Sequence, residues 1–112
     1  MIPHDAPTAQ QLIESVREWL ERDVLGETSG RLNFHARVAI NVLAMVEREL
    51  ELGPQQAAEH EARLAALGFA DDAELAAAIR AGDIEDSDEL REAIHASVRD
   101  KVRVANPKYL TP

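Results

Sequence analysis

Two stretches of the chain carry polar residues that could bind an anion such as a phosphate or a CoA group. The candidate ligand-binding residues are His35, Arg37, Asn41, Arg103, Asn106, Lys108 and Tyr109. The first three interrupt a long apolar run, and the last four lie near the end of the sequence. Guanidinium, ammonium, imidazole and amide groups are the donors that anionic oxygens accept from. We expect an anion-facing patch if the stretches meet in space, and ordinary solvated charge if they do not.

The polar residues of the apolar run have helical spacing. Arg37, Asn41, Ala44 and Arg48 follow one another at i, i+4, i+7 and i+11, so they form one stripe on a helix. This stripe either faces solvent or belongs to a buried network or anion site between helices. A buried Asn41 would need a specific hydrogen-bond partner. His35 could equally be a capping or packing residue close to the start of the helix.

Signatures of catalysis and metal binding are missing from the sequence. The glycines are isolated, so there is no phosphate-binding loop, and His60-Glu61 opens an H-E-x-x-H pattern without its second histidine. The chain has no cysteine, and its four histidines lack the spacing of metal ligands. We therefore expect no metal and no cofactor.

A serine nucleophile would need a histidine within hydrogen-bond reach. The one close pair in the sequence is His95 and Ser97, which are two residues apart and point away from each other on a helix. A serine–histidine pair across two helices has no support in the sequence. We therefore expect no catalytic residue, and an enzyme in its own right ranks behind the two functions given below.

The elements that would position these residues are all helical. Thr8 is a predicted N-cap with Gln11 in capping-box position, and apolar residues at a 3.6-residue period extend that helix to about residue 25. The central helix is expected over 33–52, with Asn33 as N-cap and an end at Gly53-Pro54. Short helices are expected over 55–67 and from Asp71 to Gly82, and a long one over 87–105.

The sequence thus predicts an all-α fold, a small helical bundle of about five helices. Three are long, at roughly 8–25, 33–52 and 87–105, and two are short. We expect a single domain over residues 1–112, with 1–7 as an extended lead-in and 106–112 as a docking tail. In that tail Tyr109 and Leu110 would dock on the bundle itself or on a partner. The first and last helices are expected to pack on the central one.

Composition excludes several classes of function. The chain has 112 residues and a formal net charge of −9, with 12 basic and 21 acidic residues, which argues against general binding to nucleic acid or anionic membrane. No apolar run is long enough to span a bilayer, and no secretory signal is visible, so cytoplasmic localisation is expected. The aliphatic core would be modest, which makes a homodimer or a complex with another chain a real possibility.

Three stretches resemble a small bacterial family of uncharacterised proteins, a domain of unknown function. They are residues 4–9 (HDAPTA), residues 34–50 (from FHARVA to EREL) and residues 104–110 (VANPKYL). Members of this family tend to be encoded beside an aminoglycoside-phosphotransferase-like kinase and an acyl-CoA dehydrogenase. The resemblance implies accessory work on hydroxyacyl or acyl-CoA substrates, but it carries no catalytic residue.

Two functions from different classes follow. The first is a non-catalytic accessory or interaction protein for the phosphotransferase-like kinase or the acyl-CoA metabolic enzyme. The alternative is a small-molecule binder that holds a phosphate- or CoA-type anion with the polar residues of the central helix and the C-terminal stretch.

Overall fold

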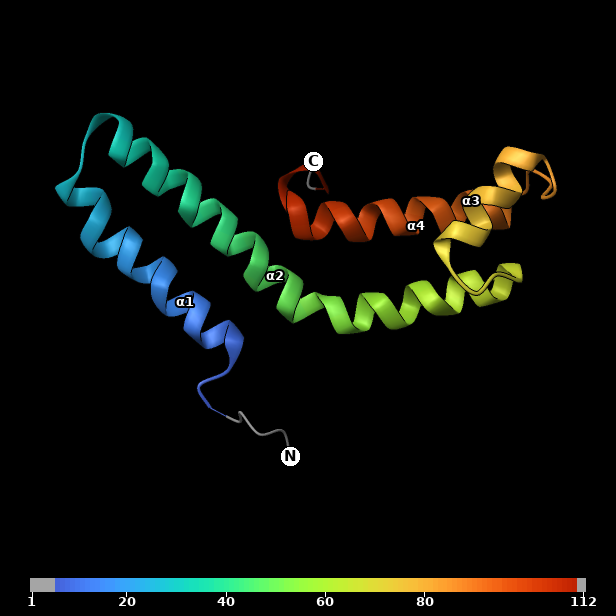
Figure 1. Cartoon of the computed structure of the whole chain (residues 1–112), viewed down its shortest axis with the longest axis horizontal. Helices are drawn as coiled ribbons and strands as arrows, with labels where there is room; N and C mark the ends of the chain where they lie inside the picture. Colours follow the sequence, from blue (N-terminus) through green and yellow to red (C-terminus); the bar gives the residue numbers. More distant parts are fainter. Residues whose placement is uncertain (1–5, 111–112) are drawn as a thin grey trace. The chain divides into compact units, whose positions relative to one another are not determined.

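The fold is known from a computed structural model, which describes residues 6–110. Within these residues the regular elements are all helices, so the predicted all-α class is confirmed (Figure 1). The chain divides into two compact units, Met1–Gly53 and Pro54–Pro112. Each unit is described separately below, and the expected single domain stays a prediction. No helix in the described part of the chain is long and apolar enough to cross a membrane.

The first unit begins with the helix that the capping signal predicted. Helix α1 spans Ala9–Trp19 and continues as the π-helix η1, Leu20–Val24, and the 3-10 helix η2, Leu25–Glu27. The Thr8 hydroxyl accepts a hydrogen bond from the Gln11 N–H at 3.1 Å, and the Gln11 side chain accepts one from the Thr8 N–H at 2.8 Å. Both halves of the capping box are therefore present.

The predicted helices over 33–52 and 55–67 are one helix. Helix α2 runs from Gly30 to Leu67 and contains Pro54, so the predicted end at Gly53-Pro54 is wrong and the predicted count of five helices is not confirmed. A proline inside a helix leaves one carbonyl without its N–H partner and crowds the preceding residue. Gly53 has no Cβ for the ring to meet, which eases that crowding, and its φ is not positive. The boundary between the units falls at this Gly-Pro pair.

Asn33 is not the N-cap of α2, because the helix starts three residues earlier at Gly30. Its side-chain amide instead donates to the carbonyl oxygens of Leu25 at 3.0 Å and Thr28 at 3.2 Å. These carbonyls lie at the end of the preceding helical segment, where they have no intrahelical partners. Asn33 therefore closes the loop between α1 and α2 rather than starting a helix.

The second unit contains the C-terminal part of α2, helix α3 (Asp72–Ala81), helix α4 (Asp88–Ala105) and the 3-10 helix η3 (Pro107–Leu110). Ser87 caps α4, as its hydroxyl accepts from the Leu90 N–H at 3.1 Å. Gly68 and Gly82 follow α2 and α3 with φ of 91° and 74°, the left-handed geometry that ends a helix. The predicted helix ends at residue 67, at Gly82 and at residue 105 are confirmed.

Both units bury few side chains. The buried apolar residues of the described chain are Ala36 in the first unit and Leu64 and Leu90 in the second. In the first unit α1 runs beside the N-terminal part of α2 (Figure 1), and Arg17 of α1 is ion-paired with Glu47 of α2. This confirms packing of the first helix on the central one. Packing of residues 87–105 against residues 33–52 would involve both units and stays a prediction.

Candidate functional site

The sequence-predicted residues of α2 lie on its exposed surface. The Arg37 guanidinium donates from Nε to the Asn33 side-chain oxygen at 3.0 Å. The Arg31 Nε lies 3.4 Å from the His35 Nε2. Arg37, His35 and Asn41 are all exposed, so within their own unit these side chains do not converge on a buried polar network.

The four predicted residues of the C-terminal stretch lie at the junction of α4 and η3. The Asn106 N–H donates to the Val102 carbonyl at 2.7 Å, and the Asn106 carbonyl accepts from the Tyr109 N–H at 3.1 Å. Arg103 and Lys108 are exposed, and Tyr109 leaves 81% of its surface exposed. Asn106 therefore has a structural role at the helix end. The tail ends at Leu110 in the described chain, and Thr111 and Pro112 lie outside the described residues.

The seven predicted residues thus belong to different units, three to the first and four to the second. An anion site that combines them stays a prediction. In the first unit, Asn41 and Arg48 line an open depression of about 410 Å³. Its other charged lining residues are Arg17, Glu21, Glu47 and Glu51. Since Arg17 is paired with Glu47 and Glu21, this depression offers an incoming anion more negative than positive charge.

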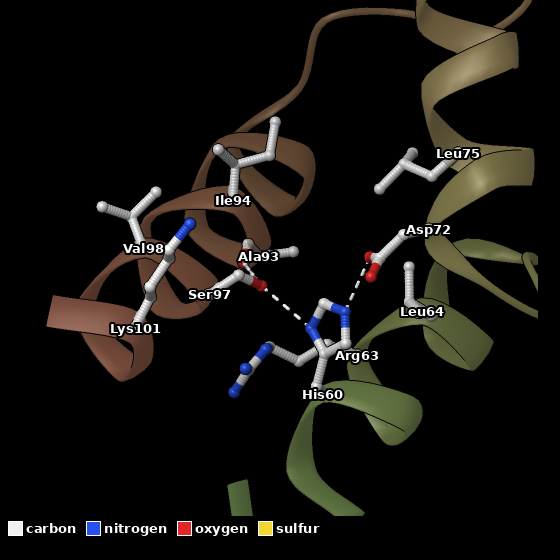
Figure 2. A pocket seen from close by; sticks show the side chains of 10 residues that line it. All are labelled: His60, Arg63, Leu64, Asp72, Leu75, Ala93, Ile94, Ser97, Val98 and Lys101. Atoms are coloured by element: carbon white, nitrogen blue, oxygen red, sulfur yellow. Dashed lines mark hydrogen bonds and ion pairs between the residues drawn. The ribbon is translucent and has the colours of Figure 1, made fainter. Parts of the chain in front are cut away.

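A second pocket lies within the second unit and was not predicted (Figure 2). It has a volume of about 270 Å³ and is formed by side chains of α2, α3 and α4. Its apolar lining residues are Leu64, Leu75, Ala93, Ile94 and Val98, and its polar ones are His60, Arg63, Asp72, Ser97 and Lys101. A mostly apolar pocket with a few polar groups at one side is typical of small-molecule sites.

A chain of hydrogen bonds joins the three helices at this pocket. The His60 Nδ1 lies 3.0 Å from the Ser97 hydroxyl, and the His60 Nε2 lies 2.7 Å from an Asp72 carboxylate oxygen (Figure 2). A carboxylate only accepts hydrogen bonds, so Nε2 carries a proton. In neutral His60 the Nδ1 then accepts the Ser97 proton, which is the order of groups in a serine–histidine–aspartate triad.

Two features separate this arrangement from a nucleophilic site. The Ser97 hydroxyl also lies 2.9 Å from the Ala93 carbonyl, which competes for its proton. Ser97 stands inside α4, whose backbone N–H groups are used within the helix, so none is left beside it to stabilise an oxyanion. We call the hydrogen-bonded residues His60, Ser97 and Asp72 the clasp. A structural role, in which the clasp holds α2, α3 and α4 together, fits this arrangement better than a catalytic role does.

A half-buried ion pair flanks the clasp. The Arg63 Nη2 donates to Asp100 at 2.7 Å, and the Gln56 amide donates to the Asp100 backbone carbonyl at 3.1 Å. The Arg63 Nε is buried and has no hydrogen-bond partner among the described residues. Buried donors are normally satisfied, so this N–H is an exception among the buried side-chain groups of the described residues.

Sequence reasoning missed this pocket because its polar residues are far apart in the chain. In the sequence, His60 fits only the start of an H-E-x-x-H pattern, and the one histidine close to Ser97 is His95. One signal for the pocket is present in the sequence, namely polar pairs with the same spacing on two helices. His60 and Arg63 are three residues apart on one helix, and Ser97 and Asp100 are three apart on another. Nothing in the sequence indicated that these faces meet.

The first unit has a second candidate surface, made of exposed apolar side chains. Leu12, Val16 and Trp19 are spaced i, i+4 and i+7 on α1, and Trp19 is 55% exposed. A second stripe of exposed apolar side chains lies on α2 and consists of Phe34, Val38, Val42 and Met45. We call these seven residues the apolar stripes. Helical spacing places the members of each stripe on one face, and apolar side chains gathered on an exposed face are typical of binding surfaces.

The described residues contain no group of three or more histidine, aspartate or glutamate side chains that could hold a metal ion. A family model described as "Domain of unknown function (DUF6285)" matches residues 26–109. The chain belongs to the DUF6285 family. The match includes the second stretch of the resemblance, residues 104–109 of the third and the whole of the pocket, while residues 4–9 lie outside it. No curated protein and no solved structure matches this DUF6285 chain.

Proposed function

We propose that the chain is a non-catalytic accessory protein that binds a partner protein through the apolar stripes of α1 and α2. The observation that supports this most is the placement of charged and apolar side chains in the first unit. A charged pair, Arg17 and Glu47, occupies the contact between the helices, while Trp19 is more than half exposed. Burying large apolar side chains is the main favourable term in association, and exposed aromatic residues are frequent anchors of interfaces.

The proposed partner comes from the family context. The resemblance implies a phosphotransferase-like kinase and an acyl-CoA dehydrogenase as neighbours in the genome, and we propose one of them as the protein that covers the stripes. The shared location would be the cytoplasm. The chain would then change the stability or activity of that enzyme rather than carry out a reaction itself.

Co-purification tests this proposal with a matched pair of variants. Val16→Glu introduces a charge into a stripe, whereas Gln11→Glu introduces the same charge at an exposed position on another face of α1 and keeps the acceptor of the capping box. We expect the tagged wild-type chain and Gln11→Glu to retain the kinase or the dehydrogenase, and Val16→Glu to lose it. Retention of neither enzyme by the wild-type chain, or equal retention by both variants, contradicts the proposal.

A second copy of the chain could cover the same stripes, and a homodimer is compatible with the proposal. It predicts a melting temperature that rises with protein concentration, because association stabilises the folded state by mass action. Sedimentation as a single species of 12.3 kDa at all concentrations would rule out the homodimer.

The alternative function is binding of a phosphate- or CoA-type anion by the seven polar residues of the sequence analysis. One observation supports it: the hydrogen-bond acceptor of Arg37 is the neutral Asn33 amide, so that bond leaves the guanidinium charge uncompensated. In a thermal-shift assay, phosphate or CoA at 100 times its Kd would stabilise the fold by about 2.7 kcal/mol. The shift should disappear in Arg37→Met and persist in Arg22→Met. If neither phosphate nor CoA changes the melting temperature, the alternative function is contradicted.

A further inference from the structure

The pocket of the second unit has more polar groups than its role in folding requires. The clasp of His60, Ser97 and Asp72 holds the three helices together, but the side chain of Lys101 lines the same pocket and takes no part in it. We propose that this pocket binds a small amphipathic carboxylate, with its apolar body between the helices and its carboxylate at Lys101. This inference is independent of the partner proposed above.

The apolar part of the site is built from three helices. Leu64 of α2 is 5% exposed and forms its buried part. Leu75 of α3 and Ile94 of α4 lie on opposite sides of the opening in Figure 2. Ile94 and Val98 leave much of their surface exposed although they line a cavity. An apolar ligand would remove this surface from water, which is favourable in proportion to the area covered.

The polar part of the site favours an anion over a cation. Asp72 is hydrogen-bonded to His60, and Asp100 is paired with Arg63, so each of the two acidic groups already has a partner. Lys101 forms no hydrogen bond or ion pair with another described residue, and it follows Ser97 by one helical turn. One ammonium therefore remains for a ligand, and a carboxylate can accept hydrogen bonds from it.

The volume of the pocket limits the size of the ligand. At about 30 Å³ per water molecule, 270 Å³ corresponds to about nine waters. This is just below the usual range for drug-sized ligands. A straight-chain carboxylic acid such as hexanoate or octanoate matches this size. For ligands this small we expect Kd values on the order of 0.1–1 mM.

Amide NMR spectra of the full chain, titrated with octanoate and octan-1-ol, test the proposal. Octanoate should shift the signals of Leu75, Ile94 and Val98 in a saturable way, and should bind more tightly than the alcohol. Replacing Lys101 by methionine keeps the apolar stem but removes the charge. We expect Lys101→Met to weaken octanoate binding about tenfold, the loss of one charge-assisted hydrogen bond, and to leave the alcohol unaffected.

The matched control is Arg99→Met, which removes a charge from α4 at a residue that does not line the pocket. This variant should bind octanoate as the wild type does. No saturable shift with hexanoate or octanoate at millimolar concentration overturns the proposal. Equal weakening by Lys101→Met and Arg99→Met, or equal affinity for acid and alcohol, overturns the assignment of the carboxylate to Lys101.

Discussion

Arg17 of α1 donates hydrogen bonds to both carboxylate oxygens of Glu47 in α2, one of them at 3.2 Å. The bond to Glu47, with a smaller contribution from Glu21, raises the pKa of Arg17 above its ordinary value. Arg17 therefore stays charged in the half-buried contact between the helices. The larger apolar residues of α1, Leu12, Val16 and Trp19, lie on a different face and are exposed.

Arg17→Met should weaken the first unit. It leaves the Glu47 carboxylate, 14% exposed, without its partner, and we expect a loss of about 1.5–3 kcal/mol in the free energy of unfolding. Urea denaturation measures this loss. Arg22→Met is the control, because Arg22 is 74% exposed and lies 3.8 Å from Glu18, and it should cost less than about 0.5 kcal/mol. Equal costs for the two variants contradict the role given to Arg17.

Asn33→Ala should destabilise the loop between α1 and α2. The variant leaves the Leu25 and Thr28 carbonyls without the amide that they accept from, at a cost of about 1–2 kcal/mol. Asn41→Ala makes the same chemical change at an exposed position of the same helix, so it controls for helix propensity. If both variants melt at the same temperature, Asn33 does not close the loop.

Pro54→Ala distinguishes the continuous helix from the predicted break. Inside α2 the change restores a backbone N–H and removes the ring, so we expect a gain of roughly 1–3 kcal/mol in the free energy of unfolding. At the first position of a separate helix, proline is well tolerated and no such gain would follow. Circular dichroism during thermal unfolding measures both helix content and stability. A loss of stability would contradict the continuous helix.

His60→Ala should loosen the second unit, because it removes the group that links Ser97 to Asp72. We expect a cost of about 1–2 kcal/mol in chemical denaturation. His95→Ala, at an exposed position of α4, should change the stability by less than about 0.5 kcal/mol. A destabilisation of the same size in His95→Ala would show that the clasp contributes nothing specific.

The features predicted correctly from the sequence are those that depend on neighbours a few residues apart. Thr8 and Gln11 form their capping box, and Gly68 and Gly82 end their helices, because these signals act through local backbone geometry. Pro54 is the exception. Its local preference for a helix start is overridden within a 38-residue helix, and the signal coincides with the boundary between units instead.

The candidate sites could not be predicted in the same way, since they depend on contacts between distant residues. His60 and Ser97 are 37 positions apart, and Arg17 and Glu47 are 30 apart. Periodicity indicates which residues share a face of one helix, but it does not indicate which faces meet. The apolar periodicity of α1 therefore predicts a helix but not its exposed face, which contains Leu12, Val16 and Trp19.

Trp19 offers the most direct test of the apolar stripes, because it is the one tryptophan of the chain. A chain labelled with 5-fluorotryptophan gives a single fluorine resonance, whose shift between H₂O and D₂O reports exposure to solvent. If a partner covers the apolar stripes, we expect a clear solvent shift for the isolated chain and its loss when the kinase or the dehydrogenase is added. A resonance protected from solvent in the isolated chain, or one that neither enzyme changes, would contradict the proposed binding surface.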